Sequence, residues 1–201
     1  MPNWCDNSLI ITGDKAAIEE FALKMMQKSD GHFHFQDFYP NPYLEDNGDP
    51  KPNSGDAWYD WAVDHWGTKW DLNDEDTEVD IDDTRVTLFF QTAWSPPEEF
   101  VKKVSADYPN LDFALSYHEG MMAYCGYMEY RNGEAIRVLT QKDLGEEESE
   151  PFCHFYTRFC EWINQKGPNE HCECGGVCDG DDGCEYCEDF VAAKAEKEAE
   201  E

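Results

Sequence analysis

The stretch Arg85–Glu98, RVTLFFQTAWSPPE, joins a strand pattern directly to the start of a helix. Its first ten residues alternate as a β-strand does, and the adjacent Phe89 and Phe90 place an apolar ring on each face. Apolar residues on both faces are typical of a strand inside a sheet. The SPPE run then predicts a helix that Ser95 caps, with a proline in its first turn and Glu98 closing a capping box. An internal strand and the helix after it therefore set the centre of the fold.

Segments on both sides of this centre continue the alternation of strands and helices. The Asn132-Gly133 pair predicts a tight hairpin turn near the end of the sheet. The expected strands cover Asn7–Thr12, Glu78–Ile81, Leu111–His118, Met121–Arg131 and Ala135–Leu139, and the expected first helix covers Lys15–Gln27. The order through the strand at 111–118 is that of a ferredoxin-like β-α-β-β-α-β sandwich, an α+β fold, and the last hairpin extends its sheet.

The predicted ferredoxin-like domain covers residues 1–144 and carries an insertion at 31–76. A GEEESE run at 145–150 predicts an acidic linker after the domain. Residues 151–201 then predict a helix with one apolar face, a cysteine-rich tract at 171–187 and a charged tail. The chain is thus expected to be one sheet domain with a helical C-terminal appendage.

The insertion contains a tryptophan-rich segment, Gly55–Asp71, which reads GDAWYDWAVDHWGTKWD. It holds four of the seven tryptophans, and their spacing predicts a short aromatic helix that ends at Gly67. Before this helix, the alternation HFHF at 32–35 suits a brief strand, and a loop rich in proline, glycine and asparagine follows it. The segment is expected either to form a binding surface or to clamp its own long loop onto the core.

Charge and composition exclude several classes of function. The net charge of −30 repels nucleic acid and anionic membranes, because binding to phosphate requires basic side chains. No apolar run is long enough to span a membrane, and the N-terminus MPNWCDNSLI lacks the pattern of a signal peptide. These features predict a cytoplasmic protein. The acidity serves either solubility or the binding of a basic partner, including mimicry of DNA.

A short tract near the C-terminus predicts a metal site. Two close pairs of cysteines on tight turns are the usual ligands of structural zinc, and the tract has glycines to make such turns. His171 could substitute for one of the cysteines, and the alternatives are an iron–sulfur cluster, a redox-active tract or an unliganded tract. The candidate zinc ligands are Cys172, Cys174, Cys178, Cys184 and Cys187.

Four separated motifs together resemble a known family. They are MPNWC-x-N at the N-terminus, WYDWAVDHWGTKWD in the insertion, the TAWSPP turn, and YHEG at the end of the fourth strand. In this order they resemble the YubB-like ferredoxin-like domain family of phages and plasmids, over roughly residues 1–130. The resemblance implies the ferredoxin-like fold and an origin in a mobile element, and it implies no reaction.

Residues from these motifs form a candidate ligand surface. Tryptophan faces and a lysine can hold a base, a sugar or a peptide, and Glu119 and His65 could act as an acid–base pair. The alternative is a small core in which the tryptophans fix the insertion to the sheet. The insertion is expected to bring the residues together, since the fold does not require their strand ends to share an edge. The candidate residues are Asn3, Trp4, Asn7, His65, Trp66, Lys69, Trp70, Thr92, Trp94, Tyr117 and Glu119.

The sequence therefore favours a non-enzymatic, acidic binding protein that acts on a basic host protein and contains structural zinc. The alternative is a domain that binds a small ligand or nucleotide, with or without hydrolytic activity. That alternative places the ligand at the surface around Trp66, Lys69 and Trp94.

Overall fold

The computed structural model describes residues 3–26, 32–141 and 143. The predicted linker at 145–150, the C-terminal helix and the cysteine tract lie outside the described residues. The elements in chain order are β1 (Trp4–Thr12), α1 (Lys15–Met26), α2 (Phe35–Phe38), α3 (Ala57–Trp66), the 3-10 turn η1 (Asp74–Asp76), β2 (Glu78–Ile81), β3 (Arg85–Ala93), α4 (Glu98–Asp107), β4 (Asp112–Glu119), β5 (Tyr124–Arg131) and β6 (Glu134–Thr140).

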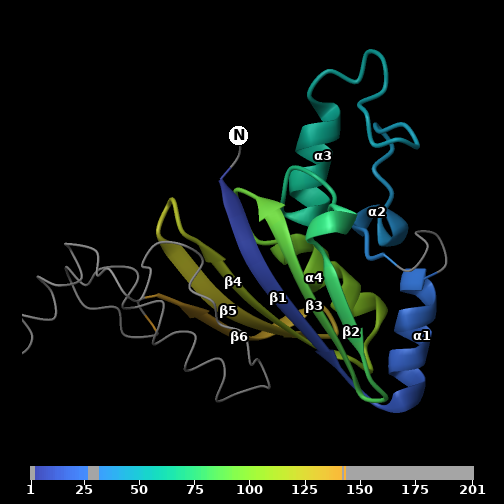
Figure 1. The fold of residues 1–201 in the computed structure, drawn as a ribbon, viewed down its shortest axis with the longest axis vertical. Helices are drawn as coiled ribbons and strands as arrows, with labels where there is room; N and C mark the ends of the chain where they lie inside the picture. The colour runs from blue at the N-terminus through green and yellow to red at the C-terminus, as the bar shows by residue number, and fades with distance from the viewer. Residues whose placement is uncertain (1–2, 27–31, 142, 144–201) are drawn as a thin grey trace, which may run out of the picture. The chain divides into compact units, whose positions relative to one another are not determined.

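The strands form one six-stranded sheet in the order β2-β3-β1-β4-β5-β6. The pairs β1–β3, β1–β4 and β2–β3 are antiparallel, and α1 and α4 cover one face of the sheet (Figure 1). The elements β1-α1-β2-β3-α4-β4 in this strand order make a ferredoxin-like α+β sandwich, and β5 and β6 extend its sheet. The ferredoxin-like topology predicted from the sequence is therefore confirmed, with β3 as an internal strand.

Most of the described chain, up to Met122 and from Gly126 to Val138, belongs to one compact unit. Residues 123–125 and 139–143 group separately, and there the Gln141 amide donates a hydrogen bond to the Ala123 carbonyl at 2.9 Å. The insertion, the sheet edge and the candidate site all lie within the first unit.

The core between sheet and helices is aromatic, and the insertion contributes to it directly. Phe33, Phe35 and Trp66 are 1% exposed or less and pack with core residues of the strands and of α4. The ring centroids of Phe35 and Phe100 lie 4.5 Å apart, within the range of a favourable aromatic pair. The indole nitrogen of Trp66 donates a hydrogen bond to the Tyr39 carbonyl at 3.0 Å. The insertion is therefore part of the domain core rather than an attachment to it.

Local details differ from the sequence predictions in three places. The HFHF stretch does not form a strand, because its second phenylalanine begins the short helix α2. Ser95 does not cap α4, since its hydroxyl donates to the Gly67 carbonyl at 2.6 Å and Pro97 takes the cap position. The strand expected from Met121 begins only at Tyr124, after a turn. In the first two cases, a tertiary contact overrides a local signal.

Candidate functional site

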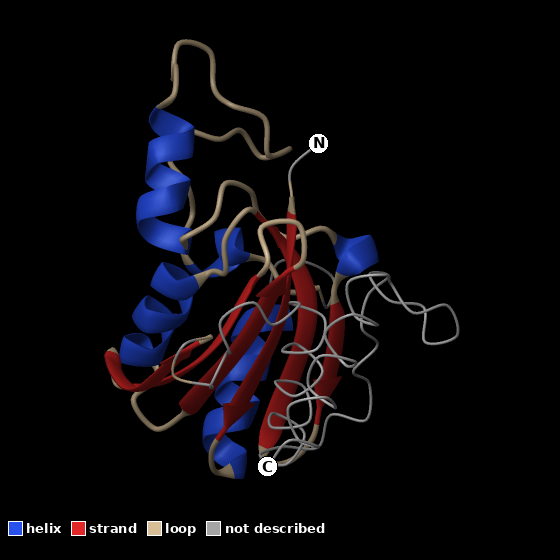
Figure 2. Cartoon of the chain, turned by 90° about the vertical axis from the view of Figure 1, so that its left-hand side faces the viewer, coloured by secondary structure: helices blue, strands red, loops and turns tan. Residues whose placement is uncertain are grey.

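The candidate residues on the strands meet at one edge of the sheet. Trp4 pairs with Ala93, and Asp6 pairs with His118, so the start of β1 lies beside the ends of β3 and β4. The helix α3 and the loop before it project beyond this edge (Figures 1 and 2). The expectation that the insertion must bring these strand ends together is wrong. Their antiparallel order already does so.

Two of the motifs are joined at this edge by hydrogen bonds between their turns. The Thr68 hydroxyl donates to the Ala93 carbonyl at 3.0 Å, and Ser95 donates to Gly67 as described above. Between these bonds, Trp94 adopts a positive φ of 72°, which is uncommon for a residue other than glycine. Hydrogen bonds thus join the WGTKWD and TAWSPP turns, and they fix the position of the residues that follow α3.

The first motif joins the same network through Asn7, which is 4% exposed. Its side-chain amide donates to the Cys5 carbonyl and to the Thr92 hydroxyl, both at 2.8 Å. Thr92 in turn donates to the Ser95 carbonyl at 2.7 Å. The side chains of Asn7 and Thr92 are therefore engaged in holding the turns together.

Other predicted site residues are also enclosed or occupied. Glu119 is fully buried, and its carboxylate accepts hydrogen bonds from the backbone of Met121 and Met122 in the turn that follows. His65 stacks on Trp61, with ring centroids 4.0 Å apart, and its Nδ1 lies 2.9 Å from the Trp61 carbonyl. Each side chain is therefore engaged by partners of its own.

Trp66 and Tyr117 are held by packing. Trp66 lies in the core, as described above, so its ring is not available to a ligand at the surface. The ring of Tyr117 covers Gly126 so closely that an added Cβ would collide with it.

Among the remaining predicted residues, Trp4, Trp70 and Trp94 are between 39% and 50% exposed. The rings of Trp4 and Trp70 lie 6.2 Å apart.

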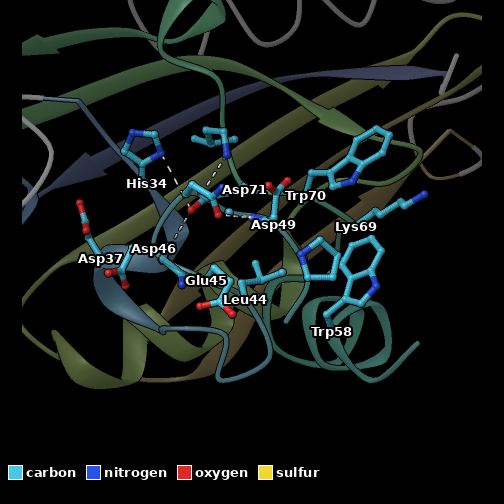
Figure 3. A pocket seen from close by; sticks show the side chains of 15 residues that line it. His34, Asp37, Leu44, Glu45, Asp46, Asp49, Trp58, Lys69, Trp70 and Asp71 are labelled. Carbon is cyan, nitrogen blue, oxygen red and sulfur yellow. Dashed lines mark hydrogen bonds and ion pairs between the residues drawn. The ribbon is translucent and has the colours of Figure 1, made fainter. Parts of the chain in front are cut away.

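Beside this edge the insertion forms a pocket of about 600 Å³, here called the insertion pocket (Figure 3). Of the predicted site residues, only Lys69 and Trp70 line it. Its walls come from three segments of the insertion: the region around α2, the loop at 44–50, and α3 with the turn after it. The lining residues are His34, Gln36, Asp37, Leu44, Glu45, Asp46, Asn47, Gly48, Asp49, Pro50, Trp58, Lys69, Trp70, Asp71 and Leu72.

Asp71 organises the inner wall of the pocket. Its carboxylate accepts hydrogen bonds from the backbone amides of Phe35 at 2.7 Å and Gln36 at 3.0 Å, the first two residues of α2. It also accepts one from the amide of Leu72 at 2.8 Å, and Nδ1 of His34 lies 3.9 Å away (Figure 3). Burial raises the pKa of Asp71, while these amides and His34 act in the opposite direction. Asp71 therefore serves as the cap of a helix distant in sequence.

The loop that forms the outer wall is tied to α3 by Asn41, which is 2% exposed. Its side-chain amide donates to the Trp58 carbonyl at 2.8 Å, and its side-chain oxygen accepts from the amide of Tyr43 at 3.0 Å. Further along, Leu44 and Pro50 form a β-bridge that closes the loop. The pocket wall is thus built from hydrogen bonds as well as from packing.

The open side of the pocket combines aromatic rings with carboxylates. The Lys69 ammonium lies 4.5 Å from the ring centroid of Trp70, 5.7 Å from Trp58 and 5.8 Å from Tyr59. Figure 3 shows the Lys69 side chain between the rings of Trp58 and Trp70. The loop opposite contributes the exposed side chains of Glu45, Asp46 and Asp49. Aromatic faces and carboxylates both attract cations.

The described residues show no cluster of three or more histidine, cysteine or acidic side chains arranged to hold a metal ion. The predicted zinc ligands are outside those residues, so the zinc site stays a prediction.

Among the same described residues, no helix is long and apolar enough to cross a membrane.

The strand order and helices define a ferredoxin-like domain whose insertion carries a pocket, and the family match agrees with this fold. Residues 65–157 match the family model described as the ferredoxin-like domain in Api92-like protein. This match names Api92-like proteins rather than the YubB-like family that the motifs resemble. No curated protein matches the chain. The crystal structure of protein api92 from Yersinia pseudotuberculosis is similar over 75% of this chain and 100% of its own, with 12% identity and a TM-score of 0.42.

Sequence reasoning missed most of the insertion pocket. Trp58 and Asp71 lie within the tryptophan-rich segment, but Trp58 appeared only as part of a helical stripe. His34 appeared only within the HFHF stretch, which was expected to be a brief strand, and the loop at 44–50 only within a tract rich in proline, glycine and asparagine. The usable signal was the accumulation of acidic residues in a loop beside an aromatic helix.

Proposed function

We propose that the protein is a non-enzymatic binding protein and that its insertion pocket holds a cationic segment of a partner protein. The observation that carries this proposal is the combination, in one pocket, of aromatic rings around an ammonium group with three exposed carboxylates. A lysine or arginine side chain of a partner can stack on the rings while the loop carboxylates attract its charge.

The charge of the whole chain supports the same partner. A net charge of −30 accelerates encounter with a basic surface and repels an acidic one. In the setting we propose, the cytoplasm of a host cell, the partner is a basic host protein. The family resemblance supports a phage or other mobile element as the source. Zinc in the cysteine tract is proposed as a structural element, and the metal content of the purified protein tests it.

The alternative function, binding of a nucleotide or other small ligand, has weaker support. Phosphate groups would lie close to Glu45, Asp46 and Asp49, and like charges repel. A flat, uncharged ring stacked on Trp70 remains compatible with the pocket, since that indole is 39% exposed. Hydrolysis has no support from the Glu119 and His65 geometry, because each side chain is held by other partners.

Neutralising two carboxylates of the pocket loop, with Glu45→Gln and Asp46→Asn, is expected to weaken binding of a basic peptide. Isothermal titration with a decapeptide of alternating lysine and alanine measures the effect. A loss of about two- to thirtyfold in affinity is expected, since exposed charge pairs are worth about 0.2–1 kcal/mol each and two are removed. Added salt should reduce both the affinity and the difference between the proteins.

The matched control replaces two exposed carboxylates that do not line the pocket, with Asp80→Asn and Glu134→Gln. It changes the net charge by the same amount, so it reports the general effect of charge. Equal losses in the two double variants would show that the peptide binds without using the pocket. Binding of the matching peptide with glutamine in place of lysine, at the same affinity, would also contradict the proposal.

A further inference from the structure

We propose that Lys69 is a built-in competitor that occupies the cation site of the insertion pocket until a ligand displaces it. This inference rests on the proposed function and adds a regulatory contact to the same site. It starts from the position of the Lys69 ammonium among the rings of Trp58, Tyr59 and Trp70. An ammonium surrounded by aromatic faces is the arrangement by which proteins bind lysine and quaternary ammonium ligands.

The surrounding structure holds Lys69 at this place. The preceding Gly67 and Thr68 are bonded to the turn after β3, at 2.6 Å to Ser95 and 3.0 Å to Ala93. The following Asp71 is fixed by three backbone amides. Lys69 and Trp70 therefore extend from a short segment that is anchored on both sides. This anchored backbone keeps the Lys69 ammonium beside the rings. Because the ammonium belongs to the same chain as the rings, it competes with any ligand cation for them.

The contact is also weak enough to be displaced. Lys69 is half-buried and Trp70 is 39% exposed, so water reaches the ammonium and the ring. A cation–π contact at such an exposed site is worth about 0.5–1 kcal/mol. When a partner cation enters, Lys69 can move into solvent while the loop carboxylates remain close to the newcomer. The cost of displacing Lys69 lowers the affinity of the free pocket, as any competing state does.

Removing the charge of Lys69 with Lys69→Met is expected to increase the affinity for tetramethylammonium by about two- to fivefold, the equivalent of one exposed cation–π contact. Tetramethylammonium is the probe because it has no hydrogen-bond donor and senses the rings and charge alone. The measurement follows the indole N–H resonances of Trp58 and Trp70 by NMR during the titration. Methionine keeps an unbranched, apolar side chain, so the walls of the pocket retain a neighbour of similar shape.

Three further variants make the result specific. Lys102→Met removes an exposed charge of α4 that does not line the pocket, and it reports the general effect of net charge. Lys69→Arg keeps a cation at the rings and should bind the probe as weakly as the wild type. Lys69→Gln removes the charge with a different shape and should act in the same direction as methionine.

A second measurement uses the wild-type protein and needs no variant. Protons next to the Lys69 ammonium should resonate upfield of their free position because they lie among aromatic rings. Saturation with tetramethylammonium should return them toward the free value as the side chain leaves. If they shift no more than those of Lys102 during the titration, Lys69 is not displaced and the inference is overturned.

The outcomes separate this inference from the proposed function. If Lys69→Met and Lys102→Met bind the probe equally, or Lys69→Met binds it more weakly than the wild type, Lys69 is no competitor. The lysine peptide can still bind under either outcome, and the proposed function then stands. If Lys69→Met gains affinity for the probe but no protein binds the peptide, the cation site exists and the proposed partner is wrong.

Discussion

Replacing Trp66 with alanine is expected to lower the free energy of unfolding by about 3–5 kcal/mol, the range for removing a buried aromatic ring. The indole is 1% exposed and packs against Phe35 in the core. Its removal also leaves the Tyr39 carbonyl without the hydrogen bond that it accepts at 3.0 Å. Urea denaturation of the purified variant measures the change.

Trp94→Ala provides the comparison for this prediction. The sequence analysis assigned both tryptophans to one candidate surface. In the structure Trp94 is 50% exposed, whereas Trp66 is 1% exposed. Its replacement should cost about 1 kcal/mol or less, because surface substitutions seldom cost more. Trp66→Phe should fall between the two, since it keeps an apolar ring and loses the N–H donor. Similar losses for Trp66→Ala and Trp94→Ala would contradict the division between core and surface.

Gly67→Ala is expected to destabilise the protein by more than the cost of a left-handed residue alone, which is about 1–2 kcal/mol. Gly67 has a φ of 81° and ends α3 in the left-handed conformation. An added Cβ would also lie 3.0 Å from the backbone nitrogen of Glu98 and 3.2 Å from that of Glu99. The start of α4 would therefore have to move away from the turn after α3, which contains Lys69.

Gly48→Ala is the control that measures only the cost of placing an alanine at a positive φ. Gly48 has nearly the same φ, 82°, but nothing lies within 4 Å of its added Cβ. The difference between the two variants in free energy of unfolding, measured by urea denaturation, therefore reports the contact between α3 and α4. Equal losses would mean that the two helices separate easily, and that the turn after α3 is not held as the structure indicates.

The layout of strands and helices could be predicted from the sequence because it depends on local periodicity. Alternation placed β3 inside the sheet, and the Asn132-Gly133 pair does form a turn with positive φ at both residues. The cap of α4 was wrong because Ser95 is recruited by Gly67, which lies 28 residues away. Local capping signals cannot anticipate a partner in a separate turn.

The candidate site was harder to predict because tryptophans serve two purposes in this fold. Trp66 and Trp70 are four residues apart, yet one lies in the core and the other is exposed. Helical spacing cannot separate them, since Gly67 ends the helix between them and changes the direction of the chain. In the sequence Asp71 only ends the tryptophan-rich segment, but in the structure it caps α2 through contacts spanning more than thirty residues.

The most direct test of the account follows the wild-type protein by NMR while the lysine–alanine decapeptide is added. The central claim is that the insertion pocket receives the cationic side chains. The indole N–H resonances of Trp58 and Trp70 should therefore shift with saturation, while that of the buried Trp66 shifts little. Shifts confined to Trp4 and Trp94, or no saturable shift at any indole, would contradict the claim.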